Sequence, residues 1–492
     1  MRWGGTRRQV ILVLALVQLS ASAAALAGAE ARRGPGPSAG SLSSVLRWNQ
    51  IAIDASGLDH AGPREQLGAG RSSRALAIVH IAIFDALNAA VGGYGSYTHL
   101  GRVHSEPSLE AVIAQAAHDA LIALFPAQSA SFDAALVEDL AKVADPRARA
   151  AGVRLGQRAA AAILALRAND GSQHAEPLLG AGYLTSDAPG AWRPDPISQL
   201  PVALGAHWGE VAPFVLARSD AFRVPPPPAL DSPAYTAAFN EVTALGGDGS
   251  TTPTLRSDDQ THAAIYWAYD GTPSLCAPPR LYNQIAVQIA KQRGSNTMQT
   301  TRLLALVNTA LADAGLAIWE SKYHYAFWRP VTGVRESDAG TGPSGLGDGN
   351  DDTLGDPTFT PLGAPASNLV ADNFTPPFPA YPSGHAGFGG ALFQTLRPFY
   401  RTDAIAFTFV SDELDGVTLD NQGNPRPLLP RSFGSLSQAE EENGQSRIYL
   451  GIHWNFDKTA GIAQGRAVAD YVFEHAFRPA RRRALRSDDG MT

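Results

Sequence analysis

The sequence predicts an all-α protein made of helical bundles. Apolar residues recur at helical spacing in many segments, whereas patterns typical of β-strands are sparse throughout the 492 residues. The apolar content of 45% and the charged content of 17% are those of a folded globular chain. A formal net charge of −7 gives no overall basic field, so nucleic acid is not an expected partner.

The first residues have the pattern of a secretory signal peptide. Three arginines precede an apolar stretch at residues 10–19, and small residues follow as far as residue 27. The apolar stretch is short for a membrane-spanning helix, although an uncleaved anchor is the competing interpretation. We therefore expect a signal peptide at residues 1–27, a flexible Gly-, Ala-, Ser- and Pro-rich leader at residues 28–44, and a secreted or periplasmic protein.

A run of helices predicts an N-terminal helical half at residues 45–245. Residues 74–88 place four aliphatic side chains on one helical face. Similar patterns cover residues 109–125, 131–143 and 147–167, the last rich in alanine. Four consecutive prolines from Pro225 and a Gly-rich loop at residues 246–253 then mark the boundary of this half.

The C-terminal half, residues 255–480, is the predicted catalytic domain. Helices are expected at residues 258–269, 281–292 and 298–322. The acidic residues of the 338–356 loop fit no EF-hand spacing, so we expect a solvated loop. No segment after the N-terminus is expected to offer about 20 apolar residues for a membrane span. Cys276 is the only cysteine, which excludes an intramolecular disulfide.

Three short segments in the last third of the chain together predict an oxyanion pocket. The first contains Lys322 and Arg329, which share one face if the helix continues, because seven residues make nearly two turns. Lysine as a point charge and arginine as a planar fork suit a bound anion. Pro330 is expected to end this helix or to begin the exit of the chain from it. For this pair alone, a solvated basic face is the alternative.

The second segment, Pro382–His385, precedes an apolar helical run at residues 386–396. Ser383 is a candidate helix N-cap, and Gly384 lets the backbone approach a ligand beside free amide groups. His385 then lies in the first turn, where it can transfer protons next to a bound anion. An ordinary capped helix with an incidental histidine is the alternative.

The third segment contains Arg447, Gly451, His453 and Asp457. Six residues of helix turn through about 600°, so a straight helix does not bring Arg447 and His453 to one face. We therefore expect a local break at Gly451, or approach to the ligand from two sides. His453 and Asp457 are four residues apart and can meet, so the carboxylate can orient the imidazole. A surface pair on a helix is the alternative.

In this order, the three segments resemble the superfamily that vanadium-dependent haloperoxidases share with type-2 phosphatidic acid phosphatases. The stretches Tyr266–Gly271, Phe327–Pro330 and Pro376–Ala386, with Trp319, are similar to the vanadium chloroperoxidases in particular. The similarity covers roughly residues 258–457. It implies a fold of two four-helix-bundle-like halves.

The resemblance also implies an activity. Hydrogen peroxide would oxidise a halide, chloride or bromide, to hypohalous acid, which then halogenates small organic acceptors. The implied cofactor is vanadate, which stays at V(V) as a Lewis acid, with neither haem nor flavin.

Roles for individual residues follow from the same resemblance. His453 would be the metal ligand, and His385 would take a proton from hydrogen peroxide, with Lys322 polarising the bound peroxide. Asp270 would orient Arg447, while Trp319 and Phe378 would form the wall of the halide pocket, with Phe378 as the chloroperoxidase-type choice. The residues expected to contact vanadate oxygens are Lys322, Arg329, Ser383, Gly384 and Arg447.

Two other functions remain open. A secreted acid phosphatase would bind phosphate in the same pocket, with His453 as the nucleophile that forms a phosphohistidine and His385 as the acid for the leaving group. Vanadate mimics the transition state of that reaction, so the pocket alone does not separate the two. The presence of Trp319, Asp270 and Phe378 around the three motifs favours the haloperoxidase. A protein that only binds phosphate or vanadate is the third reading, and it has no need of His385.

Overall fold

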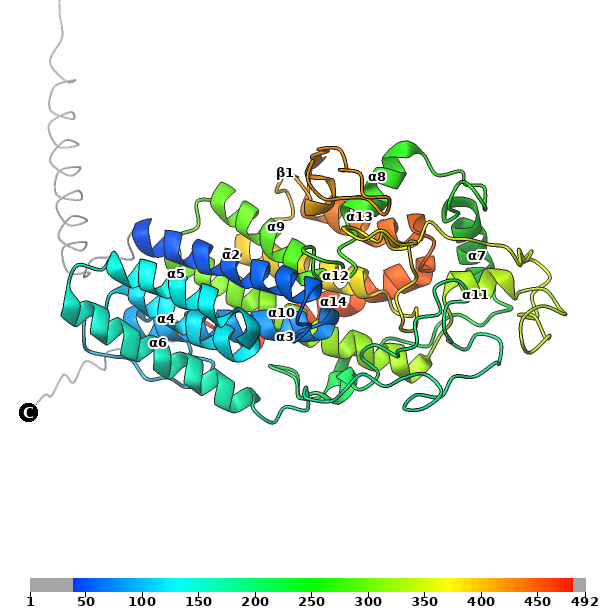
Figure 1. Ribbon diagram of the computed structural model, residues 1–492. Coiled ribbons are helices and arrows are strands. Elements are labelled where there is room, and N and C mark those ends of the chain that lie inside the picture. The colour runs from blue at the N-terminus through cyan, green and yellow to red at the C-terminus, as the bar shows by residue number, and fades with distance from the viewer. Residues whose placement is uncertain (1–38, 481–492) are drawn as a thin grey trace, which may run out of the picture.

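Helices dominate the computed structural model, which describes residues 39–480 (Figure 1). The prediction of an all-α fold is confirmed. Within this range two short strands, β1 (Phe407–Phe409) and β2 (Arg431–Phe433), pair antiparallel with Phe407 opposite Phe433. The predicted signal peptide at residues 1–27 lies outside the described residues.

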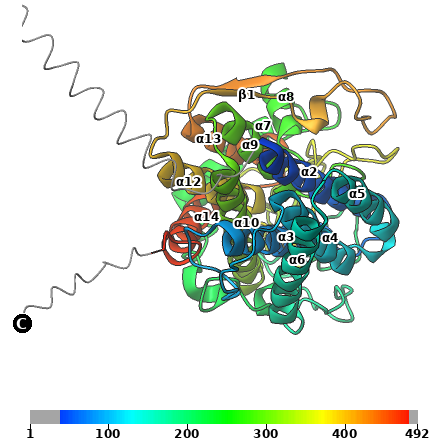
Figure 2. The ribbon, with the colours of Figure 1, turned by 90° about the vertical axis from the view of Figure 1, so that its left-hand side faces the viewer.

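Five helices form the part of the molecule on the left of Figure 1. They are α2 (Ala39–Ala61), α3 (Gly68–Val91), α4 (Leu109–Leu124), α5 (Ser129–Ala141) and α6 (Pro146–Arg167). The predicted ranges of the last three are right to within two residues. Figure 2 shows α3, α4 and α6 side by side, in agreement with their mutual contacts.

Two predictions for this part need correction. Helix α2 begins at Ala39, so residues 39–44 of the predicted flexible leader are helical. Helix α3 was predicted from one apolar face, yet nearly every residue from Ser72 to Ala89 is buried, because other helices enclose it on several sides.

Eight further helices lie in the described part of the chain after α6. They are α7 (Pro233–Leu245), α8 (Asp258–Tyr266), α9 (Pro279–Gln292), α10 (Thr297–Tyr325), α11 (Pro330–Arg335), α12 (Gly384–Tyr400), α13 (Leu436–Tyr449) and α14 (Asn455–His475). Short 3-10 turns are η1 (Pro126–Gln128), η2 (Trp208–Glu210), η3 (Ser219–Phe222) and η4 (Asp412–Leu414). Helix α10 is central, because it packs against α3 as well as against α12 and α14.

The helix expected to run from Lys322 to Arg329 does not continue that far. Helix α10 ends at Tyr325, and Ala326 takes the left-handed conformation with φ of 46°. Arg329 is the N-cap of the next helix, α11, and Pro330 occupies its first position. Proline favours that position because its fixed φ suits a helix start and its missing N–H costs nothing there. Pro330 therefore begins a helix and does not end one.

Three hydrophobic clusters lie within the described residues, and the two larger ones support the fold. The larger one joins α2–α6 to α9, α10, α12 and α14 across the two halves of the chain. A smaller one gathers aromatic side chains of α7 with Trp328 and Trp454. Trp454 donates its indole N–H to the Trp328 carbonyl oxygen over 3.0 Å, which fastens the start of α14 to the turn before α11.

Two helices, α3 and α10, are long and apolar enough to cross a membrane by composition. The expectation that no later segment would be so apolar is therefore wrong. In each helix the most apolar stretch is mostly enclosed by the protein, 89% buried in α3 and 94% in α10, as in the core helix of a globular fold.

Candidate active site

The three predicted segments meet at one buried place. It lies between the C-terminal end of α10, the N-terminus of α12, the α13–α14 junction and the segment after α8. Lys322, Arg329 and Arg447 are 0%, 2% and 1% exposed, so three cations lie in the interior. Ser383, His385 and His453 are buried beside them.

Lys322 and Arg329 converge although the helix between them is broken. Lys322 Nζ donates to the carbonyl oxygens of Pro379 (2.7 Å) and Ala380 (2.9 Å). Arg329 Nε donates to the carbonyl oxygen of Phe378 (2.9 Å) in the same stretch. One extended segment thus holds both cations, and one of the three N–H groups of Lys322 is left for a ligand.

His453 is held in a defined tautomer by Asp457. The Nδ1 atom lies 2.8 Å from Asp457 Oδ2, an oxygen that also accepts the Trp454 amide N–H at 3.0 Å. A carboxylate partner fixes the proton on Nδ1, so Nε2 presents a lone pair. Arg329 Nη1 donates to this Nε2 at 3.0 Å. The predicted contact is present, although His453 lies before α14 and only Asp457 is in the helix.

The predicted break at Gly451 is confirmed. Helix α13 ends at Tyr449, and Gly451 has φ of 72°, which few other residues adopt without strain. A Cβ atom at this position would lie 2.4 Å from the Gly246 carbonyl oxygen. The close packing and the reversal of the chain bring Arg447 and His453 to the same pocket.

The N-terminus of α12 presents its first amides to the pocket. Ser383 is the N-cap, as predicted, and its Oγ accepts from the Ala386 amide at 3.5 Å. The amides of Gly384 and His385 have no acceptor within the helix, because the first turn lacks one. Gly384 lies against the Trp319 ring, and a Cβ atom added to it would make an ordinary contact with that ring at 3.4 Å.

His385 is oriented by a backbone carbonyl that the sequence did not reveal. Its Nε2 hydrogen-bonds the carbonyl oxygen of Ala268, which can only accept, so Nε2 carries the proton and Nδ1 is free. Burial, reinforced by the charge of Arg447, holds the pKa of His385 well below its usual value. His385 is therefore neutral near pH 7 and has a nitrogen able to accept a proton.

The Ala268 carbonyl belongs to a constrained segment. Tyr269 has φ of 45°, a strained conformation for a bulky residue. Its amide donates to Glu413 Oε1 at 3.1 Å, and Glu413 is fully buried and paired with Arg426. Glu413 is 144 residues from Tyr269 in the sequence, so no local pattern marks this contact.

Arg447 and Asp270 form the ion pair expected of them. Arg447 Nη2 donates to both carboxylate oxygens of Asp270, at 2.7 and 2.9 Å. Both side chains are nearly inaccessible, at 1% and 4% exposure. The other two nitrogens of the guanidinium, Nε and Nη1, have no partner among the described residues.

The donor set fits a tetrahedral or trigonal-bipyramidal oxyanion. Three buried cations face only two carboxylates, those of Asp270 and Asp457. The positive charge that remains is costly in the interior of a protein unless an anion pairs with it. Burial and the neighbouring arginines hold the pKa of Lys322 well below its usual value, and burial lowers the pKa of Arg329 to about 9. Buried N–H groups of Arg329 and Arg447 without a partner among the described residues fit the same kind of anion. Vanadate and phosphate both satisfy these donors.

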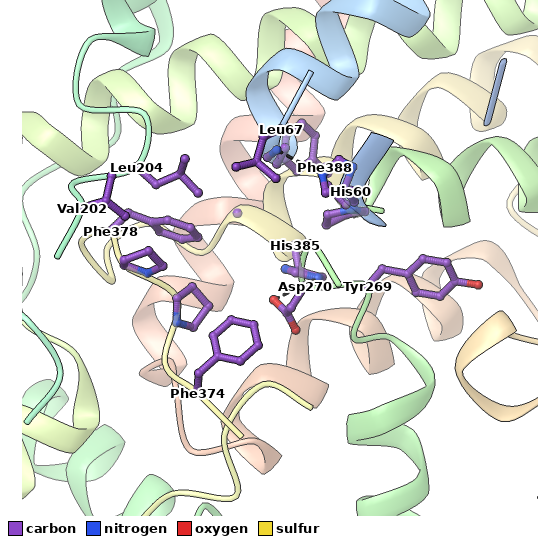
Figure 3. A pocket seen from close by; sticks show the side chains of 18 of the residues that line it. His60, Leu67, Val202, Leu204, Tyr269, Asp270, Phe374, Phe378, His385 and Phe388 are labelled. Carbon is purple, nitrogen blue, oxygen red and sulfur yellow. Dashed lines mark hydrogen bonds and ion pairs between the residues drawn. The ribbon is translucent and has the colours of Figure 1, made fainter. Parts of the chain in front are cut away.

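The pocket opens into a larger cavity of about 460 Å³ (Figure 3). His385 and Asp270 lie at its polar end, while Leu67, Leu204 and Phe378 are among the apolar side chains around it. Trp319 lies beside Phe378, with 5.0 Å between ring centroids. Its indole N–H donates to the Leu204 carbonyl oxygen (3.1 Å), so Trp319 presents only its ring to the cavity.

Comparison with known proteins confirms the resemblance predicted from the motifs. Residues 302–482 match the family model described as the VCPO second helical-bundle domain. The vanadium chloroperoxidase of Curvularia inaequalis is 37% identical to this chain, over 51% of this chain and 46% of that protein. The chain thus spans about half the length of this relative.

Solved structures share the fold over most of the chain. A bacterial vanadium-dependent iodoperoxidase superposes with a TM-score of 0.69 and 22% identity, covering 88% of this chain and 97% of that one. The apo form of a bacterial vanadium-dependent chloroperoxidase gives a TM-score of 0.62 and 17% identity, covering 83% and 94%. At these identities the similarity establishes the fold alone, which is the helical fold of vanadium haloperoxidases.

Proposed function

We propose that this protein is a vanadate-dependent haloperoxidase that uses hydrogen peroxide to oxidise chloride or bromide to hypohalous acid. One observation carries the proposal. Two neutral imidazoles lie beside three buried cations at the end of an apolar cavity: His453, whose Nε2 lone pair accepts an N–H of Arg329, and His385, whose Nδ1 is free. The similarity to vanadium haloperoxidases supports the choice of vanadate over other oxyanions.

The residues that would hold vanadate each have a free donor, apart from His453, whose Nε2 lone pair would exchange an N–H of Arg329 for the metal. His453 Nε2 would bond to vanadium, with its tautomer fixed by Asp457. The free N–H groups of Lys322, Arg329 and Arg447 and the first-turn amide of Gly384 would neutralise the oxygens, with Ser383 Oγ beside them. When bound, vanadate supplies a Lewis acid that activates peroxide without a change of oxidation state.

His385 would handle the proton of hydrogen peroxide. The Ala268 carbonyl holds the proton on Nε2, and Nδ1 can therefore accept another. The low pKa of this imidazole keeps it in the basic, neutral form in a site crowded with cations. Trp319 and Phe378 would form the apolar wall beside the halide. The Phe378 ring faces the charges of Lys322 and Arg329, at 5.1 and 4.9 Å from its centroid.

A phosphatase is the second candidate, and one observation favours it. The same Nε2 lone pair of His453, supported by Asp457, suits a nucleophile that attacks a phosphate ester. His385 would then protonate the leaving group. The buried cations fit phosphate as well as vanadate.

One purified apoprotein sample tests both candidates. After loading with orthovanadate, we expect bromination of a phenolic dye that depends on hydrogen peroxide and on bromide. The unloaded sample is assayed in parallel for hydrolysis of an aryl phosphate. Absence of bromination together with clear hydrolysis would reject the haloperoxidase and favour the phosphatase.

The protein is also proposed to be exported, on the basis of the N-terminal pattern at residues 1–27. N-terminal sequencing of the protein recovered from its natural compartment is expected to start near residue 28. A start at Met1 in a cytoplasmic fraction would reject export.

A further inference from the structure

The cavity in front of the oxyanion site is far larger than the small substrates require. A volume of about 460 Å³ holds on the order of fifteen waters at about 30 Å³ each. Hydrogen peroxide and a halide ion need only a narrow passage. The size lies within the range of cavities that bind organic molecules, about 300–1,000 Å³.

The walls of the cavity are mostly apolar, apart from the oxyanion end and the side chains of His60, Arg64 and Glu176. Away from the polar end they are mainly aliphatic, aromatic and proline side chains. They include Leu67, Val202, Leu204, Phe374 and Phe388 (Figure 3). Leu369 also lines the cavity. A hydrated halide loses water contacts against such a surface and gains no hydrogen bond in return. An apolar organic molecule gains from the same surface about 25 cal/mol for each Å² of apolar area removed from water.

The cavity is continuous with the oxyanion site and with solvent. His385, Arg447 and His453 line one end of it, so an occupant of the cavity lies next to the place where halide would be oxidised. Leu369, which also lines the cavity, is 41% exposed. A partly exposed leucine in the wall shows that the cavity reaches the surface there, and its apolar side chain suits the entry of an apolar molecule.

We propose that this cavity binds the organic acceptor, an uncharged apolar phenol or other electron-rich aromatic, and that halogenation takes place on the bound molecule. The inference rests on the proposed haloperoxidase activity. In the transfer step an aromatic carbon forms a bond to halogen and the halogen–oxygen bond of hypohalous acid breaks. The ring proton and the released hydroxide leave as water, so no further oxidant is needed.

Competition between two acceptors tests the proposal. One acceptor is an uncharged alkylphenol and the other a phenol bearing a sulfonate, and the pair is chosen to react equally fast with reagent hypobromous acid. The wild-type protein, loaded with vanadate, receives both phenols together with bromide and peroxide. The ratio of the two brominated products is compared with the ratio that reagent hypobromous acid gives. We expect the alkylphenol product to be enriched about tenfold, because burial of an apolar ring stabilises by more than 1.4 kcal/mol.

Two variants that fill the cavity sharpen the test. Val202→Trp and Leu67→Trp each place an indole in the cavity, and neither position belongs to the oxyanion site. Both are expected to return the product ratio toward that of the reagent, while tribromide formation without an acceptor stays at the wild-type rate. Val137→Trp, the same substitution at a 69% exposed position on α5, serves as the matched control and is expected to keep the enrichment.

The outcomes separate the two proposals. Bromide oxidation with the reagent's product ratio in the wild-type protein overturns acceptor binding alone and means that hypobromous acid reacts in solution. Absence of bromide oxidation overturns the proposed function and this inference with it. Enrichment that persists in both filled variants overturns the assignment to this cavity.

Discussion

The two ends of the cavity are built in opposite ways. At the polar end, side chains from three short segments are each held by defined hydrogen bonds, such as those from Lys322 to two carbonyl oxygens and from His453 to Asp457. At the apolar end, side chains such as Leu67 and Val202 come from loops of the N-terminal half and meet only because the chain folds. Under the two proposals, the polar end would determine which anion is bound, and the apolar end would determine which molecule can lie beside it.

Removal of His453 is expected to have the largest effect, because it deletes the proposed vanadium ligand of the polar end. The His453→Ala variant should retain no vanadium after gel filtration, and halide oxidation should fall to background. Metal analysis and the bromination assay measure the two losses. Circular dichroism identifies a folded variant, and retention of stoichiometric vanadium by it would remove His453 from its proposed role.

Removal of His385 is expected to separate binding from turnover. The His385→Ala variant should keep vanadium, since His453 and the cations remain, but lose about 10²–10⁴-fold in kcat. His324→Ala is the control, because His324 is exposed and lies two residues from Lys322 without a role in the site. Wild-type kcat in the His385 variant would contradict the assignment of proton transfer.

A methyl group at Gly451 tests how closely the polar end depends on backbone geometry. Gly451→Ala adds a Cβ atom 2.4 Å from the Gly246 carbonyl oxygen, at a φ of 72°. A shift of His453 by about 1 Å would lower kcat about 10²-fold. Gly340→Ala is the matched control, because Gly340 has φ of 87° with open space around it, and there we expect a cost of only about 1 kcal/mol in unfolding free energy. Equal thermal stability and activity of the two variants would show that the close packing is unimportant.

The same contrast explains what could be predicted from the sequence. The polar end was predictable because its residues lie in short motifs, where Ser383 precedes a helix and Asp457 follows His453 by four residues. Lys322 and Arg329 were correctly predicted to lie close together, but for the wrong reason. The helix stops at Ala326, and the carbonyl groups of residues 378–380 bring the two cations together instead.

Contacts between distant segments left no local pattern. The Ala268 carbonyl that orients His385 is a backbone group, and any residue type supplies one. The apolar cavity combines Leu67, Val202 and Phe374, each of which reads as an ordinary hydrophobic residue in its own segment. Helix positions were predicted well where apolar periodicity was strong, and the early start of α2 was missed in a stretch of small residues.

The smallest effect on activity is expected at Glu413, which does not touch the site and acts through Tyr269. Glu413 accepts the Tyr269 amide and holds the strained turn that carries the Ala268 carbonyl toward His385. Glu413→Ala should let this turn relax and lower kcat about tenfold, as expected when a positioning contact worth about 1.4 kcal/mol is lost. Vanadium retention should stay normal because the His453 cluster is unchanged.

Glu413→Gln provides the control for that prediction. Glutamine keeps an oxygen for the Tyr269 amide but removes the charge that pairs with Arg426. Both variants should lose stability in thermal unfolding, by about 3–5 kcal/mol, because each leaves a buried arginine without its partner. Only Glu413→Ala should also lower kcat. If kcat falls equally in both, the buried ion pair matters for general stability and the hydrogen bond to Tyr269 does not position His385.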